Sequence, residues 1–385
     1  MSSSSLNRQV VLWGIGHTNA LVVRAWRDAP IPEVRLVCVS DAPISTYSGM
    51  LPGVLAGQYR REQMQIDLAA LCESAGARFI QANVAGIDLD ARRLLFADRP
   101  PIQFDALSIG IGSVPSRSGV AGADDNRVVS IKPMSTFLDR LRERLMESDR
   151  ATRDRAIRMV VVGGGTGGAE IAFCLPPFVR RILGDHAIAL KLIHDGDTIN
   201  AGSTAATNDL VQRRLRARGL SLEMGSRVTR IEPGRVILGE DRVVEADLVV
   251  WATGAAAPPI LTRLGLPVDD RGFLLTRPSM QTLADAPIFV VGDSGTIGDS
   301  PTPKAGVHAV RQGPILRQNL ARLLGGRPLR PYRPQARFLR LINTGDGRAI
   351  GDYLGLTFEG RWCWWLKDWI DRRFVGQFAP KPPNR

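Results

Sequence analysis

Along this chain of 385 residues, short runs of apolar β-branched positions alternate with longer stretches in which apolar residues recur at helical spacing. Residues 9–40 show the order strand, turn, helix, strand, and a second unit of the same order spans residues 159–195. Strands that alternate with helices in this way indicate an α/β fold with two Rossmann-like units. We expect further helices at 63–75, 134–149, 204–218 and 305–324, a loop at 43–53, and further strands at 79–80, 94–96, 107–112, 248–254 and 288–293.

Each of the two units carries a glycine-rich turn between its first strand and its helix. The first turn spans residues 14–20 and the second spans residues 163–170. Glycines let the backbone turn tightly and approach a pyrophosphate, whose negative charge then meets the N-terminus of the following helix. One such turn alone is weak evidence, because short glycine patterns also serve as ordinary turns. Two of them predict two bound dinucleotides, as in a flavoprotein that a nicotinamide cofactor reduces.

The charge and cysteine content narrow the class of protein. The formal net charge is +12, which favours acidic partners such as nucleotides or anionic lipid. The arginines are scattered, and no compact basic run alternates with aromatic residues, so we do not expect nucleic-acid binding. Four isolated cysteines and four histidines show no metal-ligand spacing. The N-terminus has no apolar signal segment and no apolar run spans a bilayer, so we expect a cytoplasmic protein.

Four motifs in a fixed order resemble the pyridine nucleotide-disulfide reductase-like flavoproteins over nearly the whole chain. They are the two glycine turns, the strand end Ala252–Gly254 and the pair Gly292–Asp293. The resemblance implies that the first turn binds the FAD pyrophosphate, that Asp293 hydrogen-bonds the ribityl chain or a phosphate, and that the second turn binds NAD(P)H. The cofactor-binding residues that we expect are Gly14, Gly16, His17, Asn19, Asp41, Gly112, Gly292, Asp293, Lys304, Gly306, Gly163, Gly165, Gly168, Glu170, His194 and Gly254.

Three positions depart from the family pattern. Asn19 stands where the third glycine of the first turn is usual. The acid expected on the FAD ribose falls at Ser40 or Asp41, and we favour Asp41. In the second unit His194 occupies the corresponding position, followed by an aspartate. A carboxylate there accepts the ribose 2′-hydroxyl, and its absence tolerates a 2′-phosphate, so the choice between NADH and NADPH stays open.

The chain lacks the redox disulfide of true disulfide reductases. That pair is usual after the second strand, where the segment 46–53 contains no cysteine, and Cys72 has the pattern of a core residue. The bound flavin must therefore give its electrons directly to the acceptor. The segment resembles its counterpart in type II NADH dehydrogenases and sulfide:quinone oxidoreductases. Sulfide oxidation needs two cysteines beside the flavin, and none lies between Cys174 and Cys363.

The segment Pro303–Gly306 resembles the Pro-Lys-Thr-Gly element of the quinone reductases. In those enzymes the element begins a helix whose N-terminus faces the flavin, so Lys304 and the helix dipole would stabilise the anionic reduced ring. Type II dehydrogenases carry a glutamine pair further along this helix, and here the two positions are Arg311 and Gln312. We therefore take Lys304 and Gln312 as the catalytic candidates. These segments, with residues 365–371, most closely resemble the flavoproteins often fused ahead of selenide, water dikinase.

The C-terminal segment is rich in tryptophan, with Trp362, Trp364, Trp365 and Trp369 close together. At helical spacing, three of these tryptophans form an apolar face opposite charged residues. Such a helix can lie in a membrane interface on the inner face of the cell membrane, through Trp362–Phe378, or it can pack in the interior or in a homodimer. Both alternatives stay open.

We expect two Rossmann-like domains, the second inserted in the first. The FAD-binding domain comprises residues 1–125 and 277–335, the NAD(P)H-binding domain residues 126–276, and a C-terminal segment residues 336–385. The expected function is an FAD-dependent NAD(P)H oxidoreductase whose small electron acceptor is a quinone. The alternatives are a soluble FAD-dependent reductase of selenium or sulfur metabolism and a flavin-binding scaffold without activity.

Overall fold

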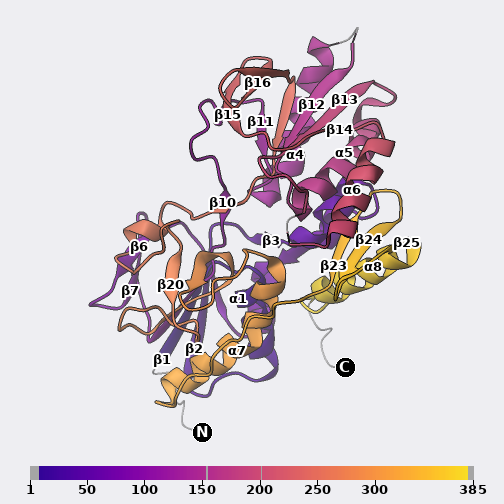
Figure 1. Cartoon of the computed structure of the whole chain (residues 1–385). Coiled ribbons are helices and arrows are strands. Elements are labelled where there is room, and N and C mark those ends of the chain that lie inside the picture. Colours follow the sequence, from indigo (N-terminus) through magenta and orange to yellow (C-terminus); the bar gives the residue numbers. More distant parts are fainter. Residues whose placement is uncertain (1–7, 153–154, 201, 380–385) are drawn as a thin grey trace.

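The computed structural model describes residues 8–152, 155–200 and 202–379, and it contains two parallel sheets of five strands (Figure 1). The first sheet has the order β21-β9-β1-β2-β5. Its strands are β1 (Arg8–Trp13), β2 (Val34–Ser40), β5 (Arg78–Gln81), β9 (Ala106–Ile109) and β21 (Ile288–Val290). The helices α1 (His17–Asp28) and α7 (Gly306–Leu324) pack against one another beside this sheet. Except for the edge strand β5, these strands bury most of their side chains on both faces, which explains their apolar runs.

The second sheet has the order β11-β18-β12-β13-β14. Its strands are β11 (Val128–Ser130), β12 (Ile157–Val162), β13 (Ile188–Ile193), β14 (Ser221–Glu223) and β18 (Leu248–Trp251). Its helices are α4 (Met134–Ala151), α5 (Thr166–Leu183) and α6 (Ala205–Ala217). The chain leaves the first sheet after β9 and returns to it with β21, so the second Rossmann-like unit is inserted in the first, as the sequence predicts.

Small antiparallel pieces surround the two sheets. Two of them are three-stranded sheets: one consists of β6 (Val84–Asp88), β7 (Arg93–Phe96) and β8 (Ile102–Gln103), the other of β15 (Val228–Glu232), β16 (Arg235–Leu238) and β17 (Arg242–Glu245). Strands also pair as β3 (Ile44–Thr46) with β4 (Gln65–Asp67), β10 (Val114–Pro115) with β19 (Ala255–Ala256), and, in parallel, β20 (Leu274–Thr276) with β22 (Gly295–Ile297). The β10–β19 pair lies where the chain crosses between the two Rossmann-like units.

The local structure differs from the sequence prediction in two of the expected elements. The expected loop contains a short helix, α2 (Leu51–Leu55), which is buried against α5. The helix expected at 63–75 is shorter, α3 (Leu68–Ser74), because Asp67 ends strand β4 and caps the helix by accepting a hydrogen bond from the Ala70 amide.

Residues 340–376 of the C-terminal segment form a compact unit on one side of the molecule (Figure 1). Strands β23 (Arg340–Asn343), β24 (Ala349–Tyr353) and β25 (Leu356–Gly360) form an antiparallel sheet, and helix α8 (Arg361–Gly376) follows it. The sheet packs against α5 and α6 of the second Rossmann-like unit, whereas the end of α8 reaches the core of the first. The sequence pattern did not predict this small sheet.

Candidate active site

A cleft of about 810 Å³ lies at the carboxyl ends of β1, β2 and β9, where the first glycine turn opens. In α/β sheets, ligands bind at this edge. The structure brings eight of the predicted residues together around the cleft: Gly14, Gly16, His17, Asp41, Gly112, Gly292, Asp293 and Gly306. The other predicted residues do not line it. They lie behind the first turn, beside the cleft or at the second turn.

The first turn depends on close contact between two backbone segments. Gly14 has a φ of +79°, and a Cβ at this position would lie 2.7 Å from the Gly110 backbone. A side chain would therefore be both strained and blocked. Asn19 lies behind the turn, where its Nδ2 donates to the Gly14 carbonyl (2.8 Å) and its Oδ1 accepts from the Ser108 hydroxyl (2.8 Å). Asn19 thus supports the turn from the protein side.

Asp293 belongs to a polar group on the wall of the cleft that the sequence pattern only partly revealed. The Ser113 hydroxyl donates to Asp293 (2.8 Å), and Lys132 Nζ lies 2.7 Å from that hydroxyl and 3.6 Å from the carboxylate. Burial lowers the pKa of Lys132, and the Asp293 charge opposes this effect. Ser113 and Lys132 were missed because they carry no motif. The available signal was their position, since each follows the carboxyl end of a parallel strand.

Gln312 and Lys304 both hold the loop that carries Asp293. Gln312 Oε1 accepts a hydrogen bond from the Gly292 amide (2.6 Å). Lys304 Nζ donates to the Gly295 carbonyl (2.6 Å) and lies 4.0 Å from the centre of the Phe273 ring. Burial lowers the pKa of Lys304 to about 8. The structure therefore places both catalytic candidates beside the cleft, in contact with its loop, and Gly306 of α7 on its wall.

His17 lies in the cleft at the start of α1. Its Nε2 is buried and has no hydrogen-bond partner among the described residues. Its ring lies 5.4 Å from that of Tyr47 and 5.6 Å from that of Phe374 in α8. Burial lowers the pKa of His17 to about 4, so the imidazole is neutral at pH 7. An unpartnered buried nitrogen at this place can bind a polar ligand atom.

The second glycine turn leaves room for a ligand only on its outer side. Gly163 has a φ of +120°, and a Cβ on Gly168 would lie 1.9 Å from the Gly163 carbonyl oxygen. A Cβ on Gly165 would meet no atom within 4 Å. The His194 ring packs against Gly164 beside the turn, and its Nδ1 lies 3.1 Å from Asp195. Gly254 follows the neighbouring strand β18, and its carbonyl accepts from the Ser116 amide (2.8 Å).

Glu170 does not point into open space but is paired with the C-terminal segment. Its Oε1 accepts from the Asn343 amide (2.8 Å) and lies 3.8 Å from Lys367 Nζ of α8. Lys367 also lies 3.1 Å from Asp371, which accepts a hydrogen bond from the Tyr47 hydroxyl (3.0 Å). Burial raises the pKa of Glu170 to about 7, and Lys367 limits the rise. This network connects the second glycine helix to the aromatic wall of the cleft.

The residues present fit two dinucleotides. At the first turn, the close approach of two backbone segments, the His17 nitrogen without a hydrogen-bond partner and the carboxylate of Asp293 belong to the same cleft. At the second turn, the open side of Gly165 lies before the N-terminus of α5, where a pyrophosphate is favoured.

The chain belongs to the pyridine nucleotide-disulphide oxidoreductase family, whose sequence model matches residues 10–313. It is 28% identical over 350 residues to demethylphylloquinone reductase NdbB of Synechocystis sp., with 87% of this chain and 83% of the relative covered. It is 23% identical over 304 residues to the type II NADH:quinone oxidoreductase of Haemophilus influenzae, with 70% of this chain and 68% of that protein covered. The sulfide:quinone oxidoreductase of Aquifex aeolicus has the same fold, with a TM-score of 0.82 at 19% identity over 98% of this chain and 93% of that one.

These findings confirm the resemblance that the sequence motifs indicated. The protein is an FAD-dependent NAD(P)H oxidoreductase, and FAD and a nicotinamide dinucleotide are its cofactors. Its electron acceptor is a small molecule.

Proposed function

We propose that this enzyme oxidises NADH or NADPH and reduces a quinone. The observation that carries the proposal is a flavin cleft without a dithiol. All four cysteines are free and buried, and none lines the cleft among the described residues. A disulfide substrate would need a thiol relay, whereas a quinone accepts electrons directly. The names of the relatives, demethylphylloquinone reductase and type II NADH:quinone oxidoreductase, support the same acceptor.

FAD, when bound, supplies the two-electron chemistry that connects the nicotinamide to the acceptor. The chain contributes binding and electrostatics. We assign the pyrophosphate of FAD to the first glycine turn and α1, and polar contacts of its chain to Asp293 and Ser113. Gln312 and Lys304 act as positioning residues that fix the Asp293 loop. The N-terminus of α7, which begins at Gly306 on the cleft wall, favours negative charge there.

For the nicotinamide dinucleotide we assign the second glycine turn, with His194 and Asp195 beside it. Glu170 acts through the C-terminal segment, because its carboxylate is occupied by Asn343 and Lys367. The domain limits 1–125 with 277–335, 126–276 and 336–385 remain our prediction.

We also propose that the enzyme is peripheral on the inner face of the cell membrane. No helix in the described part of the chain is long and apolar enough to cross a bilayer. Helix α8 exposes Trp362, Trp365 and Trp369 by 52%, 59% and 59%. Tryptophan is favoured at the membrane interface, where a quinone with an apolar tail is available.

Rapid anaerobic mixing tests the proposed reaction. The purified yellow protein should lose its flavin absorbance on addition of NADH or NADPH, and a short-chain ubiquinone or menadione should restore it. Glutathione disulfide serves as the dithiol-dependent control and should not restore it. Selenite and polysulfide test the alternative acceptors. Restoration of the absorbance by selenite or polysulfide but not by a quinone would overturn the proposal, and a flavin that neither nicotinamide reduces would favour the scaffold.

A further inference from the structure

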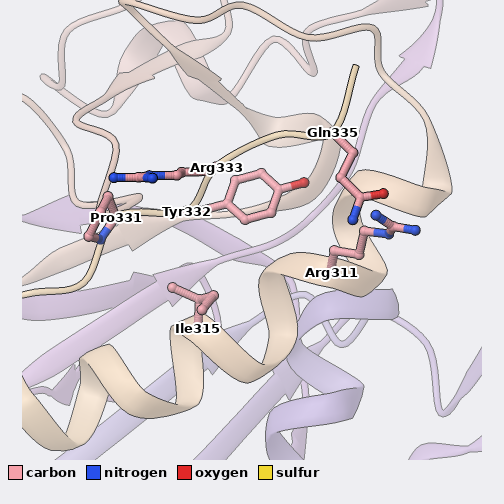
Figure 2. A pocket seen from close by; sticks show the side chains of 6 residues that line it. All are labelled: Arg311, Ile315, Pro331, Tyr332, Arg333 and Gln335. Atoms are coloured by element: carbon pink, nitrogen blue, oxygen red, sulfur yellow. The ribbon is translucent and has the colours of Figure 1, made fainter. Parts of the chain in front are cut away.

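A second pocket, of about 400 Å³, lies on the outer face of α7. It is lined by Arg311, Ile315, Pro331, Tyr332, Arg333 and Gln335 (Figure 2). Arg311 and Ile315 come from α7, and the other four residues come from the segment between α7 and β23. We call it the Arg311 pocket. It lies close to the flavin cleft, because Arg311 follows Gly306 of the cleft wall by five residues, a rise of about 7.5 Å along the helix.

The segment that closes the Arg311 pocket is fixed by buried hydrogen bonds. The Asn319 side chain is fully buried, and it accepts from the Arg330 amide (2.8 Å) and donates to the Arg330 carbonyl (2.9 Å). The Tyr332 amide donates to the Pro278 carbonyl (2.8 Å). The Tyr332 hydroxyl lies 3.2 Å from Nδ1 of the buried His308. The pocket is therefore preorganised.

The charge of the Arg311 pocket is positive and uncompensated. Neither the Arg311 nor the Arg333 side chain forms an ion pair or hydrogen bond within the described part of the chain, and no carboxylate lines the pocket. Nη1 of Arg311 is buried without an acceptor. Figure 2 shows the Tyr332 hydroxyl and the Gln335 amide directed toward the end of the pocket where Arg311 lies. A buried guanidinium donor without an acceptor is costly, and an anionic oxygen would satisfy it.

We propose that the Arg311 pocket binds the negatively charged group of the electron acceptor: a carboxylate, sulfonate or phosphate attached to a quinone ring. This inference rests on the proposed function and specifies its substrate class. Arg311 supplies the charge, and Gln335 and Tyr332 supply polar contacts to this group at the same end of the pocket, so that the attached ring lies on the side of Arg311 that faces the flavin cleft. In the reaction, NAD(P)H and one proton give two electrons and two protons to the quinone, which becomes the hydroquinone.

Calorimetry on the flavin-loaded enzyme tests binding without turnover. The probes are naphthalene-2-sulfonate and the neutral naphthalene-2-sulfonamide. We expect the wild type to bind the sulfonate at least about tenfold more tightly than the sulfonamide. Arg311→Gln should weaken binding of the sulfonate at least about tenfold. Arg333→Gln should weaken it less, because this arginine lies at the other end of the pocket. Arg327→Gln, an exposed arginine with the same charge change, is the matched control and should bind as the wild type does.

Steady-state kinetics with 1,4-naphthoquinone-2-sulfonate and its parent quinone complete the test. Arg311→Gln should raise the KM for the sulfonated quinone at least about tenfold more than the KM for the parent. Equal affinity for the two naphthalene probes, or equal loss in Arg311→Gln and Arg327→Gln, would overturn the inference. Failure of the proposed function gives a different result, because the enzyme then reduces neither quinone. In that case, binding of naphthalene-2-sulfonate that is lost in Arg311→Gln still supports the anion site.

Discussion

At the scale of single residues, the second turn contains two kinds of glycine. Gly168 is required by packing, because a Cβ there would lie 1.9 Å from the Gly163 carbonyl oxygen. Gly167, one residue earlier in the same helical turn, would place a Cβ where no atom lies within 4 Å. The sequence motif alone does not separate the two positions, but the packing does.

Gly168→Ala should therefore impair the nicotinamide site specifically. The methyl group must displace the turn from the N-terminus of α5, so we expect reduction of the flavin by NADH or NADPH to slow at least about tenfold, with FAD content unchanged. Stopped-flow absorbance at a fixed nicotinamide concentration measures this rate. Gly167→Ala is the matched control and should fold and react within about twofold of the wild type. Equal rates in the two variants would contradict the packing explanation.

Lys304 provides a test by pH. Its pKa is about 8 in the native protein, against 10.5 when unfolded. Between these two pKa values the unfolded chain binds more protons than the native protein, so the free energy of unfolding rises with pH. Below about pH 8 Lys304 is protonated in both states, and the destabilisation that its burial causes is constant. Relative to Lys304→Met, the wild type should gain about 1 kcal/mol between pH 7.5 and 9.5, after allowance for solvent near the amine. Urea denaturation at both values measures it, and a difference independent of pH would be the contrary result.

At the scale of elements, helix α8 has an orientation that its sequence pattern does not give. An apolar stripe normally predicts the buried face, and interior packing was one of the two alternatives. The structure instead exposes Trp362, Trp365 and Trp369 and buries Lys367 and Asp371, so the interior alternative is wrong for these three tryptophans. The charged face lies inward because Glu170 and Tyr47, distant in sequence, pair with it.

This contrast explains how much the sequence could predict. The two parallel sheets, their order of insertion and the glycine turns follow from local periodicity and turn chemistry. The contacts of Ser113, Lys132 and Gln312 do not, because each depends on a partner from another strand end or helix. The small sheet β23–β25 was missed for a similar reason, since its short strands are stabilised by packing on α5 and α6.

The buried pair in α8 can be tested by removing one partner. Asp371→Asn leaves Lys367 with the Gly49 carbonyl and, as the remaining carboxylate within the described part of the chain, the more distant Glu170, so we expect a loss of about 3 kcal/mol in the free energy of unfolding. The double variant Lys367→Met, Asp371→Leu should lose less than the sum of the single changes. Asp209→Asn breaks a helical pair of the same spacing that is 65% exposed on both sides, and it should change stability by less than about 0.5 kcal/mol. Equal losses at Asp371 and Asp209 would refute the structural role.

At the scale of the whole molecule, helix α8 contacts both the second glycine helix and the flavin cleft, and it also carries an exposed apolar face. Its inner face reaches the second glycine helix through Lys367, and its Phe374 ring packs on His17 of the flavin cleft. Its outer face presents the exposed tryptophans, with Leu354 and Leu356 of the adjacent hairpin exposed by 56% and 68%. A surface that docks on this face therefore lies close to the cleft from which the acceptor is reduced.

Vesicle sedimentation tests whether that surface is a membrane. Replacement of Trp362, Trp365 and Trp369 by glutamine should reduce binding to vesicles of anionic phospholipid at least about tenfold, because the apolar face is lost while the net charge of +12 remains. The flavin reduction rate should stay unchanged, since the three side chains are exposed and none of them lines the cleft. The matched control replaces three exposed apolar residues elsewhere, Val243, Val268 and Leu283, and should bind vesicles as the wild type does. If the tryptophan variant instead converts a lipid-independent dimer to a monomer in analytical ultracentrifugation, the face belongs to a second copy of the chain and the membrane proposal is wrong.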